Sequence, residues 1–99
     1  MKDAHMTRML DPIPPGEVLL MEFLEPLAIS QNQLARDIDV PVSRIAAIVK
    51  GDRSITADTA LRLATYFGTS PEMWIRLQGE YDLRLARQTT WPKVRRCYT

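Results

Sequence analysis

Between residues 31 and 54 the sequence contains several hydrogen-bond donors and cations. These residues are not accompanied by the pairs of groups that catalysis requires. These donors are Gln31, Ser43, Arg44, Lys50, Arg53 and Ser54. Arg can donate two hydrogen bonds to guanine, Ser can donate to a base or a phosphate, and Lys attracts phosphate as a point charge. Residue types of this kind predict contacts with a nucleic acid.

Catalytic and metal chemistry find little support. His5 is the single histidine and Cys97 the single cysteine, and they lie at opposite ends of the 99 residues. One His and one Cys so far apart cannot supply metal-ligand spacing or a nucleophile with its base, and a lone cysteine cannot form an internal disulfide. We therefore expect no catalytic residues, no metal, no cofactor and no enzymatic activity.

The elements that must position these donors are two short helices. Leu34, Ala35 and Ile38 share one face of the first, and Ile45, Ile48 and Val49 share one face of the second. Small Ala35 allows the helix backbones to approach closely. The pattern favours a helix-turn-helix, a unit that presents its second helix to the DNA major groove, over an ordinary helical hairpin.

The turn between the two helices has its own signals. Asp39 stands where such turns need a positive φ, which Asp tolerates better than most residues. Val40 precedes a proline, so it should be extended and can fill the corner, while Pro41 should open the second helix. Gly51 is expected to end that helix as a C-terminal cap.

On the second helix the residues that do not face the core are the candidate readers of DNA. We expect base contacts from Val42, Ser43, Arg44 and Ala47, with Val42 and Ala47 against thymine methyl groups and Arg44 on guanine. Arg44 could instead be solvated or contact a phosphate. Backbone contacts are expected from Gln31, Lys50, Arg53 and Ser54.

Three further helices complete an all-α chain. The first starts at Pro14–Glu17, buries Leu20, Phe23, Leu24 and Leu27, and should end or kink at Pro26. Ser30 should cap the next helix. Ser54 or Thr56 should cap the fourth helix, which buries Ala60, Leu63, Ala64 and Phe67. A fifth helix starts at Ser70-Pro71 and runs to about Arg87, with Trp74, Leu77, Tyr81 and Leu85 on its apolar side.

We expect a flexible leader at 1–10, one DNA-binding domain at 11–87 and a basic tail at 88–99.

Net charge is only +1, so any nucleic-acid surface must be a focused patch, which dimerisation would double. Residues 84–99 contain five basic residues and no acidic one, whereas residues 1–28 are acidic. No stretch is long and apolar enough for a membrane span, and the first residues lack the apolar region of an export signal. We expect a cytoplasmic protein.

From Pro14 to Leu83 the sequence resembles the HigA-type antitoxins, a branch of the Xre/Cro-like helix-turn-helix family also labelled virulence-associated protein I. The most specific matching segments are Gly51-x-Arg53, Thr59-Ala60-Leu61-x-Leu63 and Ser70-Pro71-Glu72-x-Trp74-x-x-Leu77-Gln78. The sequence departs from the common pattern at Asp39, where Gly is more usual, and in its apolar reader residues.

The resemblance implies a five-helix domain of the Cro/lambda-repressor type. It also implies a homodimer that represses its own operon and neutralises a HigB-type toxin, a ribosome-dependent mRNA endonuclease related to RelE. By position, Val42, Ser43, Arg44 and Ala47 correspond to the family's major-groove readers, and Gln31, Lys50 and Arg53 to its backbone contacts.

Two surfaces and two alternative functions remain open. The acidic residues Glu17, Glu22 and Glu25 of the first helix are the natural candidates for contact with a basic toxin, although they could simply be solvated. The fifth helix and the tail are the expected dimer contact. The alternatives are a stand-alone repressor without a toxin and a protein-binding module that has lost contact with DNA.

Overall fold

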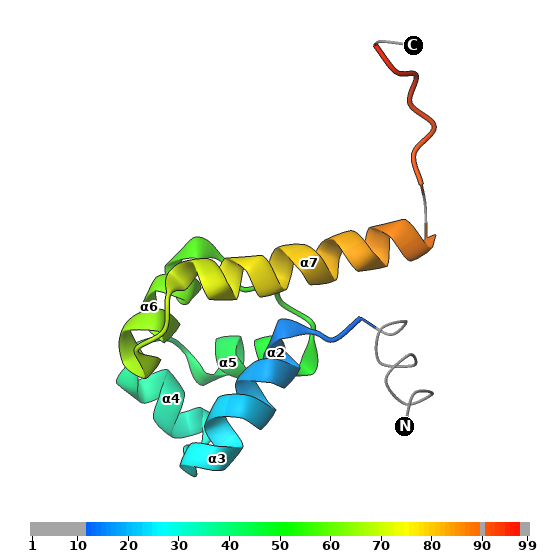
Figure 1. Cartoon of the computed structure of the whole chain (residues 1–99). Coiled ribbons are helices and arrows are strands. Elements are labelled where there is room, and N and C mark those ends of the chain that lie inside the picture. Colours follow the sequence, from blue (N-terminus) through cyan, green and yellow to red (C-terminus); the bar gives the residue numbers. More distant parts are fainter. Residues whose placement is uncertain (1–11, 90, 98–99) are drawn as a thin grey trace, which may run out of the picture.

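The computed structural model describes residues 12–89 and 91–97, and within them every regular element is a helix (Figure 1). The expected leader, with His5, lies outside the described residues. The first helix runs without a break through α2 (Pro15–Val18), η1 (Leu19–Leu24) and α3 (Glu25–Leu27). It is followed by α4 (Gln31–Asp37), α5 (Val42–Lys50), α6 (Ala57–Phe67) and α7 (Pro71–Thr89). The expected all-α domain of five helices is confirmed.

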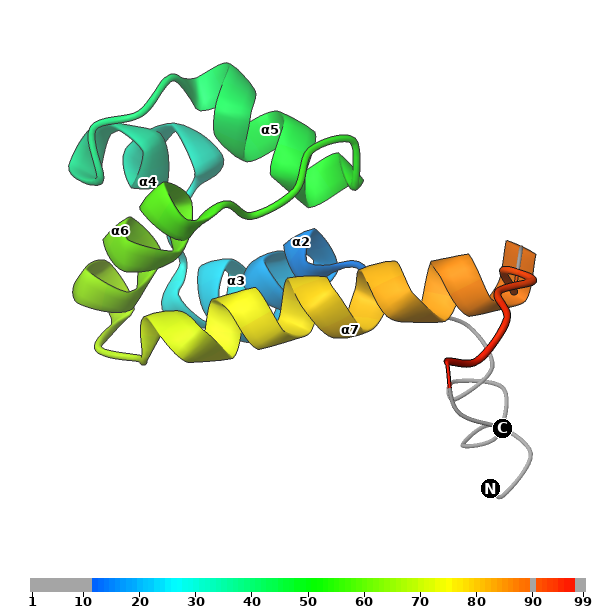
Figure 2. The same ribbon diagram turned by 90° about the horizontal axis from the view of Figure 1, so that it is seen from above.

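The core lies where these five helices meet. The first helix lies between α5 and α7, and α6 joins α7 to the pair formed by α4 and α5 (Figure 2). Trp74 is fully buried and packs with Phe23 and Phe67, with ring centroids 5.1 Å and 6.4 Å away. The remaining buried side chains are mostly aliphatic and include Leu19, Leu24, Leu34, Ile45, Ile48, Ile55 and Leu63. Each helix of the described region is too short or too polar to span a lipid bilayer.

The first helix ends at Leu27, one residue after Pro26, close to the expected end. The six residues before Glu25 form a π-helix that was not predicted, in which the Glu25 N–H donates to the Leu20 carbonyl five residues back. This wider turn accommodates a residue that lacks an N–H and would crowd the preceding turn of an α-helix. Leu19 is fully buried, which the sequence pattern missed, and Leu27 is 55% exposed.

Most helix ends follow the predicted caps. The hydroxyl groups of Ser30, Thr56 and Ser70 accept hydrogen bonds from the backbone three residues ahead. Gly51 ends α5 and Gly68 ends α6, both with a positive φ. Helix α7 continues to Thr89, two residues beyond the predicted boundary, and Leu85 near its end is exposed rather than buried.

One glycine determines how closely the first helix approaches α5. Gly16 is buried, and a Cβ atom on it would lie 1.8 Å from the carbonyl oxygen of Ile48 and 2.7 Å from the Cα of Val49. Both neighbours are backbone atoms, which cannot rotate away as a side chain can. Only glycine allows this approach, so the position of α5 depends on it.

We predict that Gly16→Ala lowers the free energy of unfolding by about 3 kcal/mol, because α5 must move away from the first helix. Gly79→Ala is the matched control. Gly79 lies within α7, and no atom outside the surrounding backbone of that helix lies within 4 Å of an added Cβ. The substitution should raise stability by about 0.5–1 kcal/mol. Urea unfolding of both variants measures the difference, and equal stabilities would contradict the proposed packing.

Candidate DNA interface

The turn between α4 and α5 has the predicted positive φ. Asp39 has a φ of 60°, and the N–H of half-buried Val40 donates to the Ala35 carbonyl over 2.9 Å. Pro41 is extended and is the N-cap rather than the first helical residue, so α5 begins at Val42. The Arg62 guanidinium donates to the carbonyl of Ile38 over 2.7 Å. This contact from α6 secures the turn, and no local pattern indicated it.

Helix α5 is buried on one face and open on the other. Ile45 and Ile48 are fully covered, whereas Val42 and Ser43 are exposed at its amino-terminal end. Ala46 and Ala47 are half-buried. Figure 2 shows α5 at an edge of the molecule, with the other helices on one side of it. The structure therefore brings three of the predicted base-contacting residues, Val42, Ser43 and Ala47, to one accessible helix.

Arg44, the fourth of these residues, forms an ion pair with α6. Its guanidinium lies 3.4 Å from the Asp58 carboxylate at the start of α6, and its side chain is only 25% exposed. Asp58 also accepts a hydrogen bond of 3.0 Å from Arg62. The Arg44 Nε atom is buried without a hydrogen-bond partner in the described part of the chain. Arg44 therefore borders the open face of α5, and a base contact would require it to leave Asp58.

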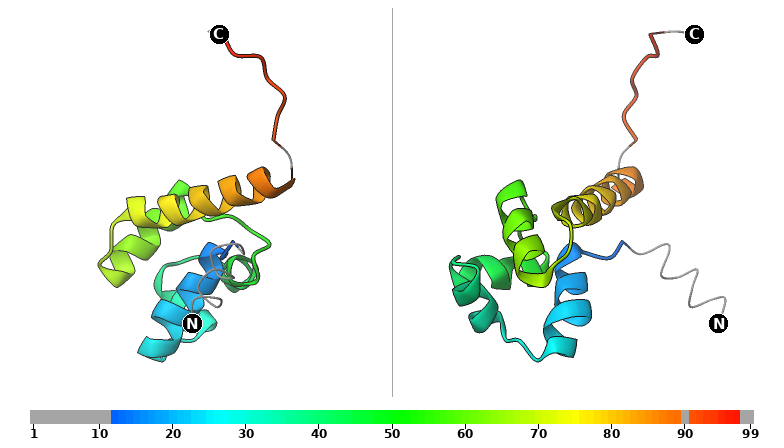
Figure 3. Two further views of the ribbon diagram at one scale, coloured as in Figure 1. Left: turned by 45° about the vertical axis from the view of Figure 1, so that its right-hand side comes forward. Right: turned by 60° about the vertical axis from the view of Figure 1, so that its left-hand side comes forward.

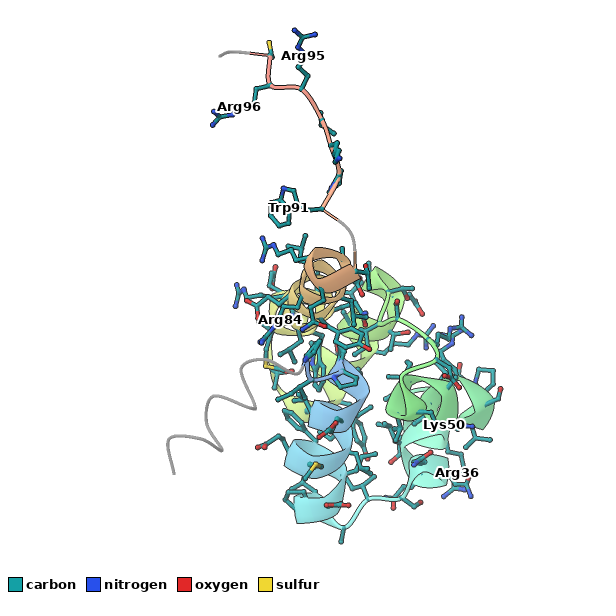
Figure 4. All side chains as sticks on the ribbon, turned by 90° about the vertical axis from the view of Figure 1, so that its right-hand side faces the viewer. Arg36, Lys50, Arg84, Trp91, Arg95 and Arg96 are labelled. Atoms are coloured by element: carbon teal, nitrogen blue, oxygen red, sulfur yellow. The ribbon has the colours of Figure 1, made fainter. Side chains whose placement is uncertain are left out.

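The predicted backbone contacts fall at two places. Gln31 is the half-buried first residue of α4, directly after the Ser30 cap. Lys50 ends α5, and Arg53 and Ser54 are exposed in the connector that follows it. Figure 4 shows Lys50 on the same side of the molecule as Arg36. The predicted backbone contacts therefore lie before α5 in the chain, at the start of α4, and directly after it, at Lys50 and in the connector.

A buried glutamine holds this connector in place. The N–H of Ile55 donates to the Gln78 side-chain oxygen over 2.8 Å, and the Gln78 amide donates to Asp82 over 3.0 Å. Ile55 itself is buried, although it stands in a polar stretch. Two sequence signals pointed to Gln78: it lies four residues after Trp74 on the apolar side of α7, and it belongs to the matching segment from Ser70 to Gln78. It positions Arg53 and Ser54 relative to α7.

Helices α4 and α6 are also joined through their polar side chains. The Tyr66 hydroxyl donates to Asp37 over 2.6 Å. This hydrogen bond to the carboxylate, followed by desolvation and the negative charge of Asp37, raises the pKa of Tyr66 above its usual value. Tyr66 therefore keeps its proton and the link at neutral pH.

Three acidic residues lie on the first helix, whose start packs against α5 through Gly16. Glu17, Glu22 and Glu25 are all exposed. Met21 and Leu27 on the same helix are 53% and 55% exposed. In Figure 4 this helix, in blue and cyan, lies on the opposite side of the view from Lys50 and Arg36. Carboxylates and exposed apolar side chains thus occur together on the first helix.

Comparison with known proteins agrees with this geometry. The chain matches the helix-turn-helix family HTH_3 over residues 20–74. It is 49% identical over 76 residues to virulence-associated protein I of Dichelobacter nodosus, a match that covers 77% of this chain and 70% of that protein.

Two solved structures from Pseudomonas aeruginosa share the fold. One protein, in complex with its 18-bp operator DNA, is 43% identical with a TM-score of 0.80, covering 82% of this chain and 87% of that one. Antitoxin HigA with the higBA promoter is 39% identical with a TM-score of 0.75, covering 85% of this chain and all of that one. The chain thus belongs to the Xre/Cro-like helix-turn-helix family, in the branch of virulence-associated protein I and the HigA-type antitoxins.

Proposed function

We propose that this protein is the DNA-binding antitoxin of a type II toxin–antitoxin module, which represses its own operon and neutralises a HigB-type mRNA endonuclease in the cytoplasm. The observation that carries the proposal is the open amino-terminal end of α5 within a helix-turn-helix whose relatives were solved with operator DNA. The protein itself acts by binding and needs no cofactor or metal.

In this proposal α5 enters the major groove of an operator. Val42 and Ala47 contact thymine methyl groups, Ser43 donates to a base or phosphate, and Arg44 exchanges Asp58 for guanine. Gln31, Lys50, Arg53 and Ser54 contact the phosphate backbone and set the register of the protein on the duplex. The exposure of Val42, Ser43, Lys50, Arg53 and Ser54 supports these roles.

The proposed protein is a homodimer. A two-fold dimer places two α5 helices on the half-sites of a palindrome, about 34 Å apart. It also doubles a cationic surface that is small in the monomer, whose net charge is only +1.

The toxin is proposed to bind the first helix. An RNA-cleaving protein needs a basic surface for its substrate, and Glu17, Glu22 and Glu25 offer carboxylates beside exposed Met21. The start of this helix packs against α5 through Gly16 and Ile48, whereas Glu22 and Glu25 lie further along it, so a toxin held by these two carboxylates could be bound together with the operator. A stand-alone repressor would use only α5, and a protein-binding module without DNA contact would use only the first helix.

The DNA contacts are tested by anisotropy titration with the duplex upstream of the protein's own gene. Arg44→Ala should lower operator affinity by about 1–3 kcal/mol and relax the preference for one base pair. Lys50→Ala should weaken operator and unrelated DNA alike, and should reduce the salt slope by about 0.9. Arg76→Gln on α7 is the control and should bind as the unmodified protein does. Equal affinity for operator and unrelated DNA, at every salt concentration, would contradict the assignment.

The toxin contact is tested by reversing charges on the first helix. Glu22→Lys/Glu25→Lys should abolish copurification with the basic product of the adjacent gene and its rescue of growth, because like charges then face each other. Glu80→Lys, on exposed α7, is the matched control and should retain both. If the double variant still captured the toxin, the first helix would not be the contact; if no adjacent gene encoded a toxin, the stand-alone repressor would be favoured.

A further inference from the structure

The C-terminal end carries a run of cations that the proposed reading of the operator does not use. These residues are Arg84, Arg87, Lys93, Arg95 and Arg96, and the sequence from residue 84 onward contains no acidic residue. Residues 91–97 are exposed and have no regular secondary structure. Both ion pairs found among the described residues end on Asp58, so none of the five cations is neutralised within that region. Such a patch attracts an anionic partner.

An exposed aromatic residue stands within this run. Trp91 is 70% exposed, and the Arg87 guanidinium lies 6.0 Å from the centre of its ring. Both views in Figure 3 show the tail leaving the end of α7 and extending away from the helical body. In Figure 4, Arg95 and Arg96 lie beyond Trp91, with Arg84 at the base of the tail. Cations thus flank an uncovered indole ring on both sides.

The tail begins close to the proposed phosphate contacts. Arg53 and Ser54 of the connector line a groove together with Tyr81, Asp82 and Leu85 of α7. Figures 1 and 2 agree that α5 and α7 end toward the same end of the molecule. Figure 2 shows residues 91–97 turning from there toward the side opposite α5, so the tail must swing back to meet a duplex on α5. Beyond Leu85, one further turn of α7 carries Arg87 and leads to the tail. A polyanion seated on Arg53 would therefore reach the base of the tail.

We propose that the last turn of α7 and the tail bind the phosphate backbone of duplex DNA beside the bases that α5 faces. The inference rests on the proposed function, because the operator brings the duplex to the adjoining connector. Seven extended residues span roughly 23 Å, and duplex DNA carries one charge per about 1.7 Å of its axis. Lys93, Arg95 and Arg96 can thus meet successive phosphates without reading sequence, while Trp91 is covered by the duplex.

The cations are tested with the triple variant Lys93→Gln/Arg95→Gln/Arg96→Gln in the full chain. All three side chains are exposed, so the fold should be retained. The slope of log affinity against log salt should become shallower by about 0.9 for each phosphate that the variant no longer neutralises, with roughly a tenfold loss of operator affinity near 0.1 M salt. Arg95→Lys/Arg96→Lys keeps the charges and should keep the slope. Arg76→Gln removes an exposed cation elsewhere on α7 and should also leave it unchanged.

Trp91 supplies a readout that does not depend on affinity. Trp74 is fully buried and Trp91 is 70% exposed, so acrylamide should quench mainly Trp91. Operator DNA with flanking duplex should reduce this quenching, and a DNA trimmed to the bases contacted by α5 should protect Trp91 less. The variant Trp91→Phe gives the residual signal of Trp74.

Three other results would overturn the inference, and each can be told apart from the others. An unchanged salt slope in the triple variant, with Trp91 still accessible in the complex, would remove the tail from the DNA and leave operator binding intact. Absence of operator binding by the unmodified protein would overturn the proposed function together with this inference. A dimer that sediments as a monomer after the triple substitution would assign the tail to a protein interface instead.

Discussion

The architecture depends on one helix being covered on a single face. Helix α5 buries Ile45 and Ile48 and leaves Val42 and Ser43 to solvent, and the proposed entry of α5 into a DNA groove depends on that asymmetry. The cover is provided by the first helix, whose Gly16 meets the backbone of Ile48 more closely than any side chain would allow. A bulkier residue there would displace the reading helix rather than simply loosen the core.

Local signals in the sequence were sufficient for much of the fold. Hydroxyl caps such as Ser30, the positive φ of Asp39 and the Gly51 cap each depend on a few neighbouring residues, and each was predicted and found. The first helix ends one residue after Pro26, close to the expected position, but the π-helical turn before it was not predicted. Periodicity at 3.6 residues cannot anticipate such a shift of register.

The site was less accessible to sequence reasoning, because its supports join residues far apart in the chain. Gln78 holds the connector through Ile55, and Arg62 holds the turn through Ile38. Asp58 likewise turns Arg44 toward α6, away from the orientation expected of an exposed reader. Which residues lie on α5 could be predicted from spacing, whereas the conformation of Arg44 depends on a helix that starts thirteen residues later.

The central claim is that the open face of α5 is the surface that meets DNA. The most direct measurement is an amide chemical-shift titration of the full chain with its operator duplex. The largest changes should fall on residues 42–47, the start of α4 and the connector after Lys50, with the first helix little affected. Unchanged shifts across residues 42–47, with changes confined to the first helix, would contradict the account.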